Sequence, residues 1–179
     1  VSCLLVLLRR TRNRADVPVG RMPRVTLLRP VCGVDAFDHE TLWSSFALTY
    51  PDLEILFCVA RADDPAADLV RTLIKKHPGH KARLLVGEDL ITANPKLNNL
   101  QKGWVAATGE VVVMADSNLM LPPDYIDQLL ALRGDGVGLV SCPPIGIRAN
   151  GFWARLECAF LNSNQARLQF AADSLGFGF

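Results

Sequence analysis

Acidic residues follow two apolar runs of the chain, at points where buried strands would end. Asp63 and Asp64 come shortly after the run 54–59, and Asp116 comes directly after the run 111–115. A carboxylate beside five apolar residues loses hydration unless a metal ion, a hydrogen-bond donor or solvent compensates. Mg²⁺ and Mn²⁺ take carboxylate and phosphate oxygens as ligands. These acids therefore predict a nucleotide site in which a divalent cation offsets the phosphate charge.

A third candidate is the segment 94–99, which holds Lys96 and Asn99 at the start of a predicted helix. Lysine and asparagine there can bind a diphosphate, but they can equally form a turn and a helix cap. Asp64 has a similar alternative, because an aspartate before Pro65 is a favoured N-cap. For Asp116 a purely structural role is harder to defend, since a carboxylate straight after five apolar residues loses hydration unless something compensates.

Other well-known site patterns are absent from the sequence. There is no G-x-G-x-x-G after the first apolar run, no G-x-x-x-x-G-K-[ST] and no G-x-S-x-G. A dinucleotide fold, a P-loop and a hydrolase nucleophile elbow are thus disfavoured. The five cysteines form no C-x-x-C pair, which predicts reduced, buried thiols. No spacing groups His39, His77 and His80 into a metal cluster.

Short apolar runs alternate with helical patterns, and these elements must position the candidate residues. The expected strands are 25–28, 54–59, 83–86, 111–115 and 137–141, and the expected helices are 40–48, 65–76, 96–107 and 122–132. Such alternation predicts an α/β domain with a mainly parallel sheet, flanking helices and right-handed crossovers. Ligands bind beyond the carboxyl ends of the strands in such sheets, so we expect Asp64 and Asp116 to converge there.

Composition places the chain among folded globular domains. Its 179 residues suit one domain with a sizeable core, since half are hydrophobic and the net charge is only +1. This excludes a disordered tail, a collagen-like chain and a disulfide scaffold. Residues 1–30 hold seven arginines and one aspartate, a net charge of +6, which leaves −5 for the rest. The asymmetry predicts an anionic surface beside the N-terminus, and no nucleic-acid partner.

The first residues predict the end of a membrane anchor. The run 1–8 is apolar and clustered arginines follow at once, as at the cytoplasmic end of a transmembrane helix. Crossing a bilayer takes about 20 residues, so a short surface helix or a disordered arm is the alternative. We expect residues 1–23 to be the remnant of an anchor plus a basic linker. Because the chain begins at Val1 and ends in Gly-Phe, we expect 24–179 to be a truncated domain.

A family resemblance rests on five segments in order: 25–34 (VTLLRPVCGV), 58–66 (CVARADDPA), 94–100 (NPKLNNL), 115–118 (ADSN) and 137–140 (VGLV). Together they resemble the ceramide glucosyltransferases of glycosyltransferase family 21 and their family 2 relatives with the GT-A fold. The stretch 151–162 is similar to the bacterial branch of these enzymes. The resemblance covers about 24–179 and implies an incomplete GT-A sheet with Rossmann-like topology.

The resemblance also implies roles for single residues. Asp64 matches the aspartate that contacts the uracil-ribose part of a UDP-sugar, and Asp116 matches the aspartate that binds the metal and the diphosphate. Lys96 with Asn99 is similar to the K-x-x-N element beside the nucleotide. In one respect the chain departs from the pattern, because Asn118 replaces a second metal carboxylate with a neutral amide.

The implied activity is inverting transfer of a hexose, glucose, from UDP-sugar to a membrane lipid acceptor, ceramide. A divalent cation, Mg²⁺ or Mn²⁺, is the implied cofactor. The implied location is a bacterial inner membrane with the catalytic domain on the cytoplasmic side. The family's general base and its Q-x-x-R-W element are absent from this sequence. We therefore expect the base beyond Phe179 and no sugar transfer by this chain alone.

Two alternatives remain open from the sequence. One is another family 2 transferase whose acceptor is a hopanoid or a polyprenyl phosphate, and the other is a non-catalytic remnant that binds nucleotide-sugar. The segment 152–170 has aromatic and aliphatic residues near helical spacing, which fits either a membrane interface or ordinary core packing. Arg148, just before it, is a further candidate phosphate ligand.

Overall fold

The computed structural model describes residues 22–134 and 136–176, which divide into two compact units between Gln128 and Leu129. The apolar run 1–8 and the arginines after it lie outside the described residues, so the predicted membrane anchor is not tested. Among the described residues, no helix is both long and apolar enough to cross a bilayer.

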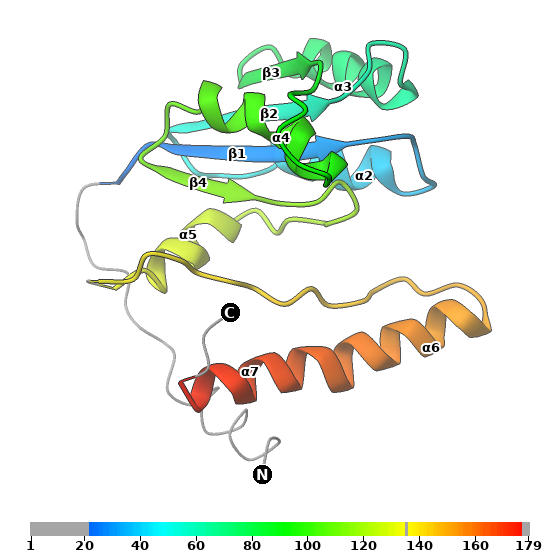
Figure 1. The fold of residues 1–179 in the computed structure, drawn as a ribbon, viewed down its shortest axis with the longest axis vertical. Coiled ribbons are helices and arrows are strands. Elements are labelled where there is room, and N and C mark those ends of the chain that lie inside the picture. Colours follow the sequence, from blue (N-terminus) through cyan, green and yellow to red (C-terminus); the bar gives the residue numbers. More distant parts are fainter. Residues whose placement is uncertain (1–21, 135, 177–179) are drawn as a thin grey trace. The chain divides into compact units, whose positions relative to one another are not determined.

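A four-stranded sheet forms the centre of the unit before Leu129 (Figure 1). Its strands are β1 (Val25–Val31), β2 (Leu53–Val59), β3 (Lys81–Val86) and β4 (Val111–Met114), in the spatial order β3-β2-β1-β4. All three pairings are parallel, so the carboxyl ends of the strands share one edge. The two central strands are almost wholly buried. These features confirm the predicted α/β class.

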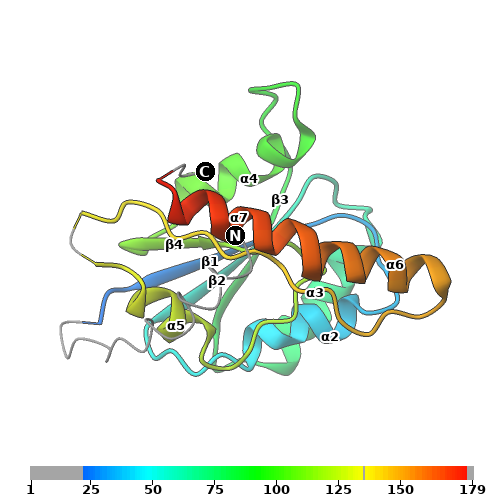
Figure 2. The same ribbon diagram turned by 90° about the horizontal axis from the view of Figure 1, so that it is seen from below.

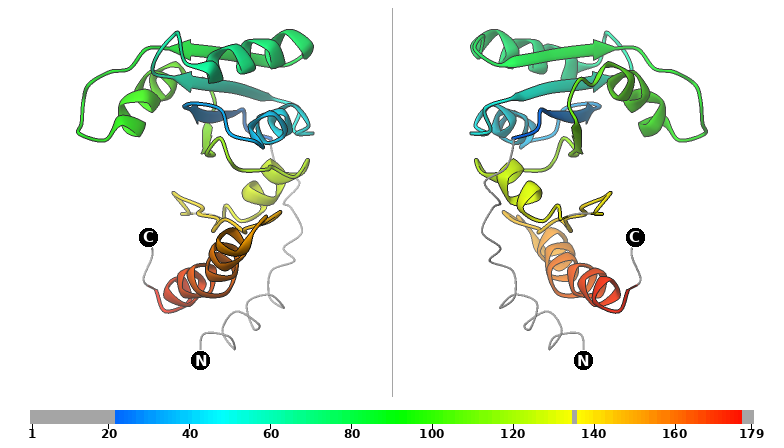
Figure 3. Two further views of the ribbon diagram at one scale, coloured as in Figure 1. Left: turned by 90° about the vertical axis from the view of Figure 1, so that its right-hand side faces the viewer. Right: turned by 90° about the vertical axis from the view of Figure 1, so that its left-hand side faces the viewer.

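Helices cover both faces of this sheet. They are α2 (Asp38–Trp43), the 3₁₀ turn η1 (Ser44–Phe46), α3 (Pro65–Lys76) and α4 (Pro95–Ala106). Helix α5 (Tyr125–Ala131) follows β4 and contains the boundary between the two units. Figure 3 shows α4 on the face opposite α2 and α3. On the α4 side, Leu28 and Leu56 pack with Leu100 in a buried cluster. On the other side, Phe57 stacks on Phe46 with a ring-centroid distance of 5.8 Å.

Local chemistry explains where the helices begin and where one breaks. Asp64 and Asn94 cap α3 and α4, and a proline occupies the first turn of each helix. The helix expected over 40–48 ends early and continues as η1. There the Ser44 hydroxyl donates to the carbonyl of Thr41 at 2.6 Å, a local side-chain bond that competes with the regular helix.

The unit from Leu129 onward is mainly one long helical run. It consists of α6 (Phe152–Phe160), the π-helical turn η2 (Leu161–Gln165) and α7 (Ala166–Ser174), which follow one another in a single rod (Figure 2). Asn162 in the π-helical turn is bonded to the preceding segment: it accepts from the Gly146 amide at 2.7 Å and donates to its carbonyl at 2.9 Å. No residue of α6 is buried.

The prediction of a fifth strand over 137–141 is wrong. The segment has no strand geometry and pairs with no strand of the described sheet. Leu139, which would have to bury its side chain to stabilise a strand, is 73% exposed. Gly136, at a φ of +80°, and Gly138 supply no side chains for cross-strand packing.

Candidate functional site

The clearest polar contact at the carboxyl edge joins Lys96 to Asp116. Asp116 follows β4, and Lys96 lies in the first turn of α4. The Lys96 ammonium donates to Asp116 Oδ1 at 2.5 Å. Both side chains are about half exposed, at 52% and 53%. The structure therefore brings together two predicted site residues that are 20 positions apart, and it leaves both accessible to a ligand.

Asparagines organise the start of α4 behind this pair. Asn94 caps the helix by accepting from the Lys96 amide at 3.0 Å. Asn98 accepts from the amides of Ile91 and Thr92 at 3.1 and 2.9 Å, and so holds the loop that leads into the helix. These bonds fix the backbone from which Lys96 projects toward Asp116.

Asn99 is buried, unlike a residue that would contact a bound nucleotide directly. Its Nδ2 donates to the carbonyl of Cys58 at 2.9 Å, and its Oδ1 accepts from Lys102 Nζ at 2.6 Å. Partial burial lowers the pKa of Lys102, against the opposing influence of Cys58. Asn99 thus joins α4 to the end of β2, and both of its side-chain polar atoms are used inside the protein.

Asp64 serves two backbone segments at once. Its Oδ1 accepts from Ala66 N at 2.8 Å, which is the predicted cap, and from Gly33 N at 2.9 Å. Gly33 lies after β1 with a φ of +65°, a conformation that favours glycine. Its neighbour Asp63 instead pairs with Arg61 at 2.6 Å on the surface. Asp64 therefore ties the turn after β1 to the start of α3.

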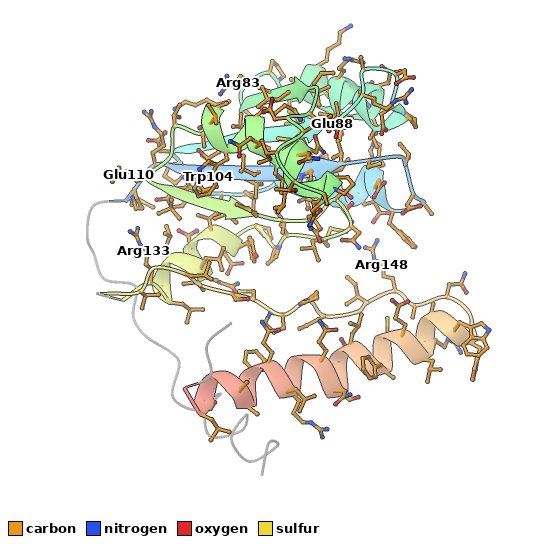
Figure 4. The ribbon with its side chains drawn as sticks, in the orientation of Figure 1. Arg83, Glu88, Trp104, Glu110, Arg133 and Arg148 are labelled. Carbon is orange, nitrogen blue, oxygen red and sulfur yellow. The ribbon has the colours of Figure 1, made fainter. Side chains whose placement is uncertain are left out.

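The predicted convergence of Asp64 and Asp116 at one edge is confirmed by the topology. β2 and β4 both flank β1 and run parallel to it, so the residues after each strand lie at the same edge. Figure 4 marks this edge by Glu88, which follows β3, whereas Glu110, which precedes β4, lies at the opposite edge. Arg148 belongs to the other unit and has left-handed backbone geometry, with a φ of +56°.

Arg29 contacts this edge from within the central strand β1, and it was not among the residues predicted from the sequence. It lies in β1, is fully buried, and donates through Nη2 to the carbonyls of Asp116, Ser117 and Leu119 at 2.9–3.0 Å. A signal was present in the sequence, because a single arginine interrupts the apolar run that forms β1. A charge within a buried strand must be held by specific partners.

The side-chain oxygen atoms of the segment 116–118 are of the type that binds a hard cation. Such a cation would be bound by a phosphate at the same time. Asp116, Ser117 and Asn118 offer a carboxylate, a hydroxyl and an amide oxygen. Within the described residues, no group of three or more histidine, cysteine or acidic side chains could hold a metal ion alone. Mg²⁺ typically uses one or two carboxylates and completes its coordination with phosphate oxygens and water. Asp116 would be the protein's carboxylate ligand in such an arrangement.

Comparison with known proteins decides the family. The family model described as glycosyl transferase family 21 matches residues 1–179. The chain belongs to glycosyl transferase family 21. This confirms the resemblance found in the five sequence segments.

Individual relatives agree with the family assignment. Ceramide glucosyltransferase 1 of Caenorhabditis elegans is 32% identical over 161 residues, which cover 89% of this chain and 34% of that protein. Ceramide glucosyltransferase of Komagataella phaffii is 36% identical over 118 residues, which cover 63% and 23% respectively. The chain therefore spans about a third or less of the length of the curated relatives it matches.

A solved structure supports the fold. The mannosyltransferase PcManGT from Pyrobaculum calidifontis, in complex with GDP-Man and Mn²⁺, matches with a TM-score of 0.60 and 26% identity. The match covers 79% of this chain and 43% of the mannosyltransferase chain. The predicted GT-A fold is thereby confirmed.

Proposed function

We propose that residues 24–179 supply the nucleotide-sugar-binding part of an enzyme that transfers glucose from UDP-glucose to ceramide. The observation that carries this proposal is the accessible pair of Asp116 and Lys96 at the carboxyl edge of a GT-A sheet, in a chain of family 21. The names of the curated relatives support the hexose donor and the ceramide acceptor.

Each site residue has a distinct part in this proposal. Asp116 would bind the divalent cation and, through it, the diphosphate, while the Lys96 ammonium would contact a phosphate oxygen directly. A carboxylate offers about four lone-pair positions, so Asp64 can hold Gly33 and Ala66 and still accept from the uridine. We assign Asn99 a supporting part, because its buried contacts hold α4 against the end of β2.

In the proposed reaction, the sugar is transferred by a single displacement with inversion at the anomeric carbon. The acceptor hydroxyl oxygen forms a bond to the anomeric carbon, while the bond from that carbon to the diphosphate oxygen breaks. UDP leaves with the electron pair, and the hydroxyl proton passes to a general base. The divalent cation, when bound, would offset the charge of the leaving group. Lys96 acts in the same sense, and we assign no residue of this chain as the base.

The acceptor side of the proposal concerns α6. Four large apolar residues of this helix are more than half exposed: Phe152, Trp153, Leu156 and Phe160. Aromatic and aliphatic residues exposed along a helix suit a membrane interface. We propose that this face contacts the lipid surface or the lipid acceptor of a membrane-bound enzyme whose catalytic part faces the cytoplasm.

Calorimetric titration of UDP into the full chain tests the nucleotide site, with Mn²⁺ and with a chelator in parallel. We expect binding to require the cation. Asp116→Ala should weaken it by about 10- to 100-fold, the equivalent of one charge-assisted contact. Asp63→Ala is the matched control, because Asp63 is an exposed aspartate at the same edge whose partner is Arg61.

Equal UDP affinity with and without the cation, or an equal effect of the two substitutions, would count against the proposal. GDP belongs in the same titration, since the matching solved structure holds GDP-Man. Tighter binding of GDP than of UDP would overturn the choice of donor. Radiolabelled UDP-glucose offered to the complete protein with ceramide, a hopanoid or a polyprenyl phosphate then decides the acceptor.

A further inference from the structure

A buried guanidinium lies directly beneath the turn that carries Asp116. Arg29 is in the middle of the sheet, in β1, and its side chain has no exposed surface. Its pKa falls to about 10 because burial outweighs the favourable charges of Asp116, Tyr125 and Asp38. The side chain therefore remains charged at neutral pH, inside the protein.

Within the described part of the chain, the Arg29 guanidinium donates to neutral groups alone. Nη1 donates to Ser45 Oγ at 3.1 Å, and Nη2 donates to the carbonyl oxygens of Asp116, Ser117 and Leu119. Nε has no hydrogen-bond partner among the described residues. Burying a charge without a hydrogen-bonded counter-charge is costly. An apolar side chain would fill the same space without that cost, so packing alone does not account for an arginine here.

The three carbonyls belong to one short turn. Within it, the Leu119 amide donates back to the Asp116 carbonyl at 3.1 Å. Nη2 has two hydrogens for three acceptors, so at least one bond is shared. Because three carbonyl oxygens of this turn accept hydrogen bonds from Arg29 Nη2, its peptide planes have little freedom to rotate. The backbone from which the Asp116 side chain projects is fixed in this way.

A second set of contacts holds the far end of the same segment. The Leu121 amide donates to Ser44 Oγ at 3.0 Å, and the Thr49 amide donates to the Pro123 carbonyl at 3.0 Å. Ser44 and Ser45 are neighbours in η1, so this 3₁₀ turn contacts both Arg29 and the end of the segment. The segment 116–123 is thereby pinned on both sides of its bend.

We propose that Arg29 is the positioning residue of the candidate site, because it sets the turn 116–119 so that the Asp116 carboxylate faces Lys96. The inference rests on the proposed function. Arg29 itself does not contact the nucleotide, since it is buried under the turn. It acts through the Asp116 backbone and places a positive charge below the region where phosphates would bind.

The planar fork of arginine suits this task better than a lysine. It donates on one side to Ser45 and on the other to the three carbonyls, with a fixed angle between its nitrogens. A lysine ammonium is a single point donor that cannot span both groups. Arg29→Lys should therefore keep the charge but hold the turn less firmly, and Arg29→Met should lose both the charge and the bonds.

Hydrogen exchange of the nucleotide-free full chain, read for the segment 116–121, tests the positioning. We expect Arg29→Met to speed exchange there by about tenfold relative to β2, because the turn opens locally. Arg29→Lys should give a smaller, selective increase. Glu54→Gln is the matched control, since it removes a mostly buried charge near the amino ends of the strands without touching the turn. The inference would be overturned if the segment 116–121 exchanged at the wild-type rate in both Arg29→Lys and a folded Arg29→Met. If Arg29→Met does not fold, the exchange rate of Arg29→Lys decides.

UDP titration with Mn²⁺ completes the test. Arg29→Met should weaken binding by about tenfold, Arg29→Lys by less, and Glu54→Gln should leave the affinity unchanged. Faster exchange with unchanged UDP affinity would overturn the role in binding. If the wild-type chain itself binds neither UDP nor GDP, the proposed function fails, while the exchange result still decides whether Arg29 sets the turn.

Discussion

At the scale of single residues, the contact between Lys96 and Asp116 should have opposite effects on the binding of a metal ion and of a nucleotide. Exposed ion pairs contribute only about 0–1 kcal/mol to stability, so this pair is poorly explained as a stabilising feature. In the absence of ligand, the ammonium competes with a metal cation for the Asp116 carboxylate. With a diphosphate present, the ammonium and the cation act on the same negative charge. The proposed site therefore gives opposite signs for metal and nucleotide binding when Lys96 is removed.

We expect Lys96→Met to strengthen binding of Mn²⁺ to the nucleotide-free chain by up to about fivefold, the most that an exposed pair supports. The same substitution should weaken UDP binding in the presence of Mn²⁺ by about tenfold or more. Electron paramagnetic resonance of free Mn²⁺ measures the first effect, and calorimetry measures the second.

Lys81→Met is the control for this pair of measurements. Lys81 forms a comparable exposed ion pair with Asp52, at 3.1 Å, beside the amino ends of the strands. It should change neither affinity. A loss of Mn²⁺ affinity in Lys96→Met would contradict the competition between ammonium and metal.

At the scale of elements, Asp64 determines how α3 begins and how the turn after β1 is attached. Asp64→Ala removes the cap and the acceptor for the Gly33 amide, so we expect a loss of about 2–3 kcal/mol in the free energy of unfolding. Asp64→Asn should lose less, because asparagine is also a good cap. Urea denaturation measures both, and Asp63→Ala should leave the free energy of unfolding close to that of the wild type. A loss of similar size for Asp63→Ala would show that the cap is not the cause.

The packing of α4 on the sheet depends on Gly103. A Cβ at this position would lie 2.5 Å from Cys58 Sγ and 3.2 Å from a Leu28 methyl carbon. Since both neighbours are buried, we expect Gly103→Ala to cost about 1–3 kcal/mol of unfolding free energy by overpacking. Gly79→Ala, where a Cβ meets nothing within 4 Å, is the matched control.

A double variant identifies the atom responsible. Cys58→Ala removes the sulfur, so Gly103→Ala should be less harmful in that background than in the wild type, as measured by urea denaturation of all four chains. Strictly additive losses would place the clash elsewhere.

At the scale of the whole molecule, the two edges of the sheet have different chemistry. The amino edge holds Glu54, which accepts from the Thr26 hydroxyl at 2.6 Å and from the amide and hydroxyl of Thr108 at 2.6 and 2.7 Å. Arg83 Nη2 lies 3.4 Å from Glu54 Oε2. Figure 4 labels Arg83 and also Glu110, which lies at this amino edge. Burial acts to raise the pKa of Glu54, but these hydrogen bonds and the Arg83 charge outweigh it, so the pKa lies below its ordinary value.

This depressed pKa predicts a loss of stability in acid. Because the folded state holds the Glu54 carboxylate ionised to a lower pH than the unfolded chain does, its contribution is complete above about pH 5 and is lost as the pH falls through the folded pKa. Glu54→Gln should lower the unfolding free energy at pH 7 by about 1–3 kcal/mol. It should also make the unfolding free energy fall less steeply from pH 5 to pH 3. Equal slopes for the two proteins in urea denaturation would contradict this.

The family, the alternation of strands and helices, and the residues that begin α3 and α4 could all be predicted from the sequence. These features are local: apolar runs predict buried strands, and Asp-Pro and Asn-Pro are helix-start signals that need no distant partner. The strand expected over 137–141 was wrong for the complementary reason. A strand is stable only when it pairs with a neighbouring strand and buries one of its faces. The apolar residues of 137–141 do not show whether such a neighbour is present.

Which of the predicted residues come into contact, and which groups hold them there, depends on the packing of the whole fold. Lys96 and Asp116 come together because α4 crosses one face of the sheet and delivers its first turn to the edge where β4 ends. Asn99, which matched the same motif, turns inward to the end of β2 instead. In the sequence, Arg29 is a single charged residue within an apolar run. In the fold, its guanidinium donates to three carbonyls of a turn that lies 87–90 positions away. The sequence shows which chemical groups are available and how far apart they lie along the chain. Contact between distant groups depends on the order of the strands and on how the helices cross the sheet, and both arise only when the core packs.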